Sequence, residues 1–102
     1  GLSSFGFDVV AELNRLRMAI DLSHVGERTC LDTAAATRQP ILLTHANAKA
    51  VTNRVRNKSD EVIRAVAKTG GLIGASIHGF MNWDDARAVP SPPAPHRQPG
   101  RD

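Results

Sequence analysis

Residues 19–25, with the sequence AIDLSHV, contain the pattern on which the choice of fold rests. The apolar segment 18–22 is too short for a helix and typical of a buried strand, and a small hydroxyl residue and His24 follow it. The same arrangement returns in ILLTHAN, residues 41–47, where a second apolar segment is followed by a threonine and His45. We therefore expect both histidines at the carboxyl ends of short buried strands.

Two segments with helical patterns alternate with these strands. Residues 6–17 place apolar side chains on one face at helical spacing, and the alanine-rich residues 26–38 are expected to form the next helix. Pro40 ends that helix and opens the second strand, residues 41–44. The beginning of the chain is therefore predicted as helix, strand, helix, strand.

A third helix and a third strand are expected after a polar connection. Asn57 or Ser59 can cap a helix whose first turn is acidic, and Gly70 is expected to end it in a left-handed conformation. GLIGAS, residues 71–76, is then a third strand, and its glycines allow close backbone packing. This alternation favours an α/β fold in which helices cover a parallel sheet.

The composition limits what the chain can do. Of 102 residues, 41% are hydrophobic, enough for one small domain, and no apolar run approaches the ~20 residues of a membrane span. The lone cysteine, Cys30, excludes an internal disulfide and a cysteine-based zinc finger, and we expect it to be buried. The net charge is only +3 and the charges are interspersed over the body of the chain, so no nucleic-acid surface is expected.

The carboxyl-terminal residues 86–102 differ in composition from the rest. They are rich in proline and cannot build a core, so we expect them to be disordered or extended. No signal peptide is recognisable and the chain begins with glycine, so we interpret it as an excerpt of a longer protein, with a cytoplasmic location favoured. The expected division is residues 1–85 as the folded part and residues 86–102 as a proline-rich tail.

The two histidines share one side of the expected sheet, because right-handed crossovers bring the carboxyl ends of parallel strands together. His24 and His45 are therefore expected to face a common space. Two neutral imidazoles can share one zinc ion at about 2.0–2.1 Å, with Ser23 and Thr44 as small neighbours or hydrogen-bond donors beside them. The simpler alternative is that each histidine is an ordinary hydrogen-bonded side chain, since two ligands alone do not make a site.

Three segments resemble, in order and spacing, the central part of the renal-type (membrane) dipeptidases, the zinc-dependent peptidase family M19: GLSSFGFDVVAELNRLRMAIDLSHV, PILLTHANAKAV and RVRNKSDEVIRAVAKTGGLIG. The resemblance covers residues 1–76. It implies that His24 and His45 bind one zinc of a two-zinc centre and that Arg56 holds the carboxylate of a dipeptide substrate. A guanidinium suits that role because its planar fork matches a carboxylate and keeps its charge.

The resemblance also implies a fold and an activity. The fold would be a partial (β/α)8 TIM-type barrel of about three helix–strand units, and the activity would be dipeptide hydrolysis by a metal-activated hydroxide. A whole barrel needs about 250 residues, and the family's other zinc ligands have no counterpart here, so no catalytic residue is assigned within this chain. We interpret residues 1–85 as a fragment of a zinc-dependent dipeptidase barrel, inactive unless the remainder is supplied.

Other interpretations stay open at this point. The chain could instead be a non-catalytic metal-binding or partner-binding remnant of such a barrel, because its proline-rich tail could dock onto an aromatic-lined groove. The intact protein could form a homo-oligomer. His78, at the end of the third strand, could face the same space as a substrate or metal contact, although the resemblance gives it no role.

Overall fold

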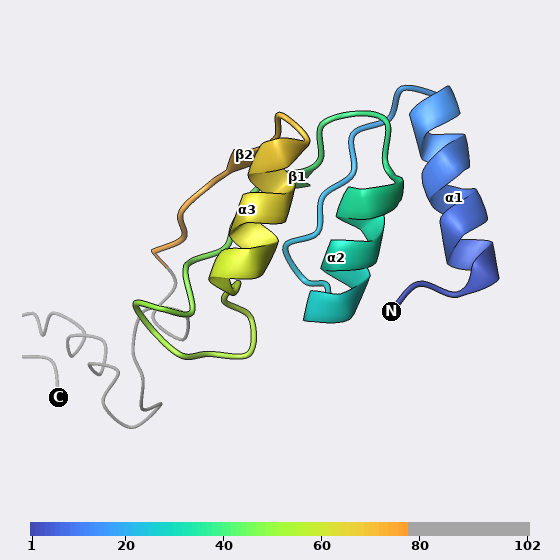
Figure 1. The fold of residues 1–102 in the computed structure, drawn as a ribbon. Coiled ribbons are helices and arrows are strands. Elements are labelled where there is room, and N and C mark those ends of the chain that lie inside the picture. Colours follow the sequence, from blue (N-terminus) through green and yellow to red (C-terminus); the bar gives the residue numbers. More distant parts are fainter. Residues whose placement is uncertain (78–102) are drawn as a thin grey trace, which may run out of the picture.

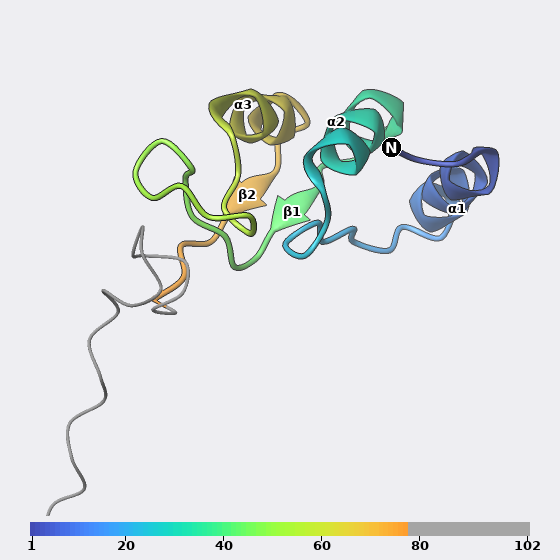
Figure 2. The ribbon, with the colours of Figure 1, turned by 90° about the horizontal axis from the view of Figure 1, so that it is seen from below.

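The computed structural model describes residues 1–77, which form a layer of helices on a layer of strands (Figure 1). The elements are α1 (Ser4–Arg15), α2 (Glu27–Ala36), β1 (Leu42–Leu43), α3 (Asp60–Lys68) and β2 (Leu72–Ile73). Figure 2 shows the three helices side by side on one side of the strands. Within residues 1–77, no helix combines the length and apolar character that crossing a membrane requires. His78 and the expected tail lie outside the described residues.

The strands β1 and β2 are parallel neighbours, as the sequence predicts. Leu42 pairs with Leu72, and Leu43 pairs with Ile73. The contact continues beyond β2, since the Gly74 amide donates to the Leu43 carbonyl at 2.7 Å. Two parallel strands need a crossover connection, and α3 supplies it.

The first predicted strand is present as a single parallel bridge on the other edge of β1. Asp21 pairs with Leu42. The Leu42 amide donates to the Ile20 carbonyl at 2.8 Å, and the Leu22 amide donates to the Leu42 carbonyl at 2.9 Å. The spatial order is therefore residues 20–22, β1, β2, all parallel. The predicted α/β class is confirmed, although each strand is shorter than predicted.

The core lies between the strands and the helices. Its buried residues are Val10, Ile20, Leu22, Cys30, Ile41, Leu43, Ala46, Val62 and Val66. Side chains alternate between the two faces of a strand, so Ile20 and Leu22 enter the core while Asp21 between them is exposed. Cys30 is 0% exposed, as predicted.

The helix α3 begins at the predicted acidic turn. The Ser59 hydroxyl accepts a hydrogen bond from the Val62 amide at 3.2 Å, which makes Ser59 the N-cap. Asn57, the other candidate, is buried, and its side chain donates to the Thr52 carbonyl at 2.8 Å instead. Gly70 follows α3 with a φ of +81°, as predicted. Helices α1 and α2 also start and end close to their predicted bounds.

Gly71 and Gly74 lie where the chain around β2 approaches the chain around β1 most closely. A Cβ at position 71 would lie 1.7 Å from the Ile41 carbonyl oxygen, and a Cβ at position 74 would lie 2.2 Å from the Thr44 carbonyl oxygen. Backbone atoms packed in a sheet cannot move aside as the end of a flexible side chain can. The predicted role of these glycines in close packing is therefore confirmed.

Gly71→Ala should lower the free energy of unfolding by about 2–4 kcal/mol, because the strands must separate to admit the methyl group. Gly26→Ala is the matched control, since no atom of the described residues lies within 4 Å of a Cβ there. As a change at an N-cap, the control should cost at most about 1 kcal/mol. Urea unfolding followed by circular dichroism measures both variants. Equal costs at the two positions would contradict the close approach of β1 and β2.

Candidate functional site

His24 and His45 lie side by side at the carboxyl ends of their strands. Their Nε2 atoms are 2.7 Å apart, and their ring centroids are 4.8 Å apart with the planes inclined by 59°. Both residues are exposed to solvent. The two rings lie together because residues 20–22 and β1 are parallel neighbours, and neighbouring parallel strands end at the same edge of a sheet. The structure therefore brings the two predicted imidazoles together.

Arg56 joins the two histidines from the loop between β1 and α3. Its guanidinium contacts both ring nitrogens of His24. The residue is half-buried, so the contact is made in a partly sheltered position. All three site residues predicted from the sequence thus belong to one cluster.

Hydrogen bonds hold the loop between β1 and α3 over the strand ends. At its base the Lys58 amide donates to the Asn47 carbonyl at 2.8 Å. The buried Lys58 ammonium donates to the Val25 carbonyl, next to His24, at 2.7 Å. The Asn47 side chain exchanges two hydrogen bonds with the backbone of Ser76, at 2.8 and 2.9 Å. The loop is therefore tied to the ends of both outer strands.

Asp21 joins the ends of the two histidine-bearing strands through four hydrogen bonds. Its Oδ1 accepts from the Ser23 amide at 3.1 Å, the Ser23 hydroxyl at 2.7 Å and the Thr44 amide at 3.2 Å. Its Oδ2 accepts from the Thr44 hydroxyl at 2.5 Å. No role for Asp21 was predicted. The signal that could have found it is a carboxylate between two buried strand residues, Ile20 and Leu22, which needs specific partners.

The same two hydroxyl groups also contact His45. The Ser23 hydroxyl accepts a hydrogen bond from the His45 amide at 3.1 Å. The Thr44 hydroxyl oxygen lies 2.9 Å from His45 Nδ1. Ser23 and Thr44 are therefore neighbours of the histidines, as expected. Ser23 bonds to the backbone of His45, and Thr44 contacts its ring.

The surroundings favour a neutral His24 and an ionised Asp21. Partial loss of hydration and the charge of Arg56 lower the pKa of His24. Burial alone would raise the pKa of Asp21, but the hydrogen bonds from Ser23 and Thr44 outweigh it and hold this pKa well below its usual range. A neutral imidazole is the form that binds a metal ion.

The lowered pKa of Asp21 predicts how the stability of the fold depends on pH. An ionised Asp21 stabilises the folded chain above the ordinary aspartate pKa of about 3.9, and this stabilisation is lost as the pH falls towards the lower native pKa. Asp21→Asn should therefore cost about 1–2 kcal/mol at neutral pH, allowing for solvent screening. The cost should begin to shrink below about pH 4, because the unfolded chain then binds a proton that the folded Asp21 takes up only at a lower pH.

Urea unfolding at about pH 7 and about pH 3 measures this difference. Asp8→Asn, at an exposed position of α1, is the matched control and should change the stability by less than about 0.5 kcal/mol. An Asp21→Asn penalty of equal size at both pH values would show that the carboxylate charge does not stabilise the strand ends.

The cluster offers two imidazole nitrogens to a metal ion. In residues 1–77, no group of three or more histidine, cysteine, aspartate or glutamate side chains is placed to hold a metal. Two tetrahedral ligands at about 2.0–2.1 Å from one ion lie roughly 3.3 Å apart. The exposed rings of His24 and His45, whose Nε2 atoms are 2.7 Å apart, need to separate only slightly to reach that distance. The pair therefore fits one part of a zinc site.

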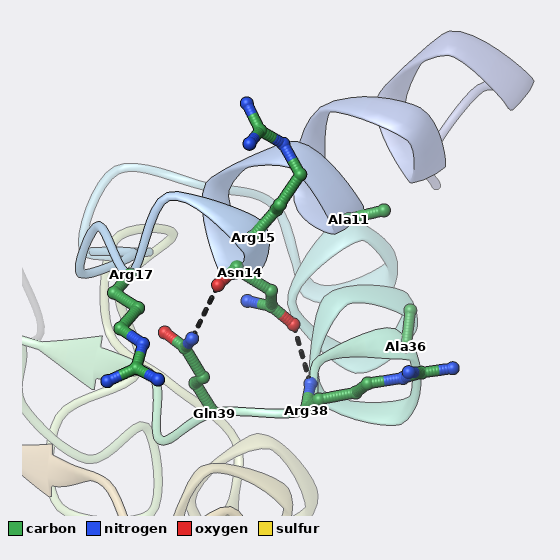
Figure 3. A pocket seen from close by; sticks show the side chains of 7 residues that line it. All are labelled: Ala11, Asn14, Arg15, Arg17, Ala36, Arg38 and Gln39. Atoms are coloured by element: carbon green, nitrogen blue, oxygen red, sulfur yellow. Dashed lines mark hydrogen bonds between the residues drawn. The ribbon is translucent and has the colours of Figure 1, made fainter.

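A cavity of about 690 Å³ lies elsewhere, between the end of α1 and the segment after α2 (Figure 3). It is lined by Ala11, Asn14, Arg15, Arg17, Ala36, Arg38 and Gln39. Asn14 joins its walls, accepting from the Arg38 amide through Oδ1 and from the Gln39 side chain through its carbonyl, both at 2.6 Å. Figure 3 shows the Arg15 and Arg38 guanidinium groups pointing in different directions. The residues that line this cavity do not include His24, His45 or Arg56.

The family described as membrane dipeptidase (peptidase family M19) matches residues 1–92. An uncharacterized protein in the pqqA 5′ region of Klebsiella pneumoniae is 36% identical over 93 residues, which are 90% of this chain and 34% of that protein. An uncharacterized dipeptidase of Schizosaccharomyces pombe is 36% identical over 78 residues, which are 76% of this chain and 19% of that protein.

The fold of the chain matches part of a solved structure. The crystal structure of a metallopeptidase from Rhodobacter sphaeroides, liganded with a phosphinate mimic of the dipeptide L-Ala-D-Ala, matches 82% of this chain with a TM-score of 0.76 and 36% identity. The match takes in 24% of that protein. The chain thus spans about a third or less of the length of these relatives. Its helices and parallel strands correspond to part of a TIM barrel, so the predicted partial barrel is confirmed.

Proposed function

The chain belongs to the membrane dipeptidase family, peptidase family M19, and we propose that it contributes part of the active site of a zinc-dependent dipeptidase. In this site His24 and His45 bind a zinc ion, and Arg56 binds the carboxylate of a dipeptide. The observation that carries the proposal is the 2.7 Å approach of the two Nε2 atoms beside the Arg56 guanidinium.

Each histidine turns its Nε2 atom towards the space between the two rings. His45 Nδ1 lies 2.9 Å from the Thr44 hydroxyl oxygen, so its other nitrogen already has a partner. The hydroxyl groups of Ser23 and Thr44 lie 3.3 Å apart and join the two strand ends. A bound zinc ion polarises a scissile carbonyl and makes a hydroxide available near neutral pH.

Arg56 is suited to recognise the substrate because it lies next to His24. A guanidinium binds a carboxylate through two parallel hydrogen bonds, which orient it as well as hold it. In a dipeptide only one residue separates the free carboxylate from the peptide bond, so a carboxylate held by Arg56 brings that bond beside the histidines. Such orientation contributes to the rate as well as to affinity.

The substrate class that we propose is a dipeptide with a free carboxylate. The Rhodobacter sphaeroides relative binds a mimic of L-Ala-D-Ala, which supports this class. Residues 1–77 supply two imidazole ligands and the guanidinium, and the match takes in only 24% of that relative. We therefore propose that hydrolysis requires the rest of the barrel and that the chain alone is inactive.

A chimaera tests the proposal directly. Residues 1–77 replace the matching segment of the Rhodobacter sphaeroides metallopeptidase, and retained zinc and L-Ala-D-Ala hydrolysis are measured after dialysis. We expect the chimaera to keep zinc and activity, and the separate chain of 102 residues to show no hydrolysis. A chimaera as stable as its parent that binds no zinc would contradict the proposal. One that binds zinc without hydrolysing dipeptides would favour a non-catalytic metal-binding remnant.

A further inference from the structure

We propose that Asp21 and Thr44 are positioning residues that hold His45 as its Nδ1–H tautomer, with an unprotonated Nε2 facing His24. The consequence for metal binding rests on the proposed function. The proton arrangement itself follows from the hydrogen bonds of this chain.

The argument begins with the single proton of the Thr44 hydroxyl. Its oxygen lies 2.5 Å from Asp21 Oδ2 and 2.9 Å from His45 Nδ1. A carboxylate that accepts four hydrogen bonds has no proton to give, so the hydroxyl proton must point to Asp21. The hydroxyl then presents a lone pair to His45, and Nδ1 must carry the proton that lies between them. The reverse arrangement would set two lone pairs against each other at 2.5 Å.

Ser23 repeats this arrangement on the backbone of His45. Its hydroxyl donates to Asp21 Oδ1 at 2.7 Å, and its lone pair accepts the His45 amide proton at 3.1 Å. One carboxylate thus orients two hydroxyl groups, and each of them accepts a hydrogen bond from an N–H group of His45. Because the backbone and the ring are both held, the ring orientation and the tautomer are set together.

The contact with His24 agrees with this tautomer. His45 Nε2 has no proton in the Nδ1–H form, so in the metal-free chain the 2.7 Å bond between the rings must be donated by His24 Nε2. The Arg56 guanidinium, which is donor-only, contacts both ring nitrogens of His24, and in this arrangement only Nδ1 can accept a hydrogen bond from it. Through His24 Nδ1, donors and acceptors alternate from Arg56 to Asp21, and the second contact of the guanidinium, with His24 Nε2, is not a hydrogen bond in this arrangement.

The arrangement keeps on His45 the lone pair that a metal ion needs. In solution a free imidazole exchanges between two tautomers, and only one of them leaves Nε2 available. Groups that fix a ligating histidine through its second nitrogen typically contribute about 10–100-fold to metal affinity. We therefore expect Thr44 to affect zinc binding although its hydroxyl, within residues 1–77, bonds only to His45, Asp21 and Ser23.

The tautomer is tested on the metal-free chain of 102 residues by nitrogen-15 NMR of the imidazoles. Spectra are recorded at about pH 8, above the ordinary histidine pKa of about 6.5, and the His45 signals are assigned by their absence from His45→Gln. We expect His45 Nδ1 to show the protonated-nitrogen shift and Nε2 the unprotonated shift. Thr44→Val should move His45 towards the other tautomer, and Thr44→Ser should restore the wild-type shifts.

Thr33→Val is the matched control, since Thr33 lies in α2 and its hydroxyl donates to the Thr29 carbonyl of the same helix at 2.7 Å. It should leave the His45 shifts unchanged. Wild-type shifts in Thr44→Val, or a protonated Nε2 in the wild type, would overturn the proposal. Because Thr44 is exposed, its substitution spares the core, and Thr44→Ser shows whether any change comes from the hydroxyl.

Zinc titration of the chimaera provides the second measurement. Thr44→Val should weaken zinc binding about 10–100-fold, and Thr44→Ser should weaken it much less. If His45 has the expected tautomer and the chimaera binds no zinc, the proposed function fails and the positioning role of Asp21 and Thr44 stands. If zinc binds and the Thr44→Val tautomer does not change, the positioning role fails and the proposed function stands.

Discussion

His45→Ala should remove zinc from the dialysed chimaera and lower its kcat/KM for L-Ala-D-Ala about a thousandfold. A metal ion contributes several kcal/mol of stabilisation to the transition state, and about 1.4 kcal/mol corresponds to each factor of ten in rate. The structure places His45 Nε2 2.7 Å from its counterpart on His24, so the removal of either ring takes away half of the ligand pair. Zinc content and initial rates measure the effect.

The double variant makes this prediction more specific. If His24 and His45 hold the same ion, His24→Ala should cost as much as His45→Ala, and combining them should add little. Groups that act separately would instead give losses that multiply. Full retention of zinc by either single variant would contradict the assignment of the pair.

Arg56→Met should lower the kcat/KM of the chimaera for L-Ala-D-Ala by about 100–1,000-fold. Two hydrogen bonds to a charged group contribute about 3–4 kcal/mol together, and methionine keeps much of the side-chain length without the donors. Zinc content should not change, because the guanidinium is not a metal ligand. Kinetics on the dipeptide measure the loss.

A substrate without the carboxylate separates recognition from folding. The carboxyl-terminal amide of the same dipeptide should be a poor substrate for the wild type, and Arg56→Met should affect its hydrolysis little. Arg64→Met, at an exposed position of α3, is the matched control and should leave both substrates unaffected. Equal losses on the dipeptide and its amide would mean that Arg56 supports the loop rather than the substrate.

The strand ends could be predicted because their signals are local. Apolar runs followed by His24 and His45 marked where the strands end, and the alternation with helices gave the parallel order. Gly70 was identifiable because a left-handed position after a helix favours glycine. The role of Arg56 came from the resemblance to a family and not from any local pattern.

The bonds that organise the cluster could not be predicted because they join distant residues. Asp21 reaches Thr44 only because residues 20–22 pair with β1 in one register, and a shift of one residue would turn Asp21 to the other face. The Arg56 loop is held by Lys58, a buried cation whose ammonium group donates to the Val25 carbonyl and to the Cys30 sulfur. A charged residue in a polar loop gives no sign that it will be buried.

The most direct test of the shared ion is the anomalous scattering of zinc in crystals of the chimaera. The account predicts one zinc peak with the Nε2 atoms of His24 and His45 both about 2.0–2.1 Å away. A zinc peak bound by only one of the two rings, or by neither while the rings stay hydrogen-bonded to each other, would contradict it.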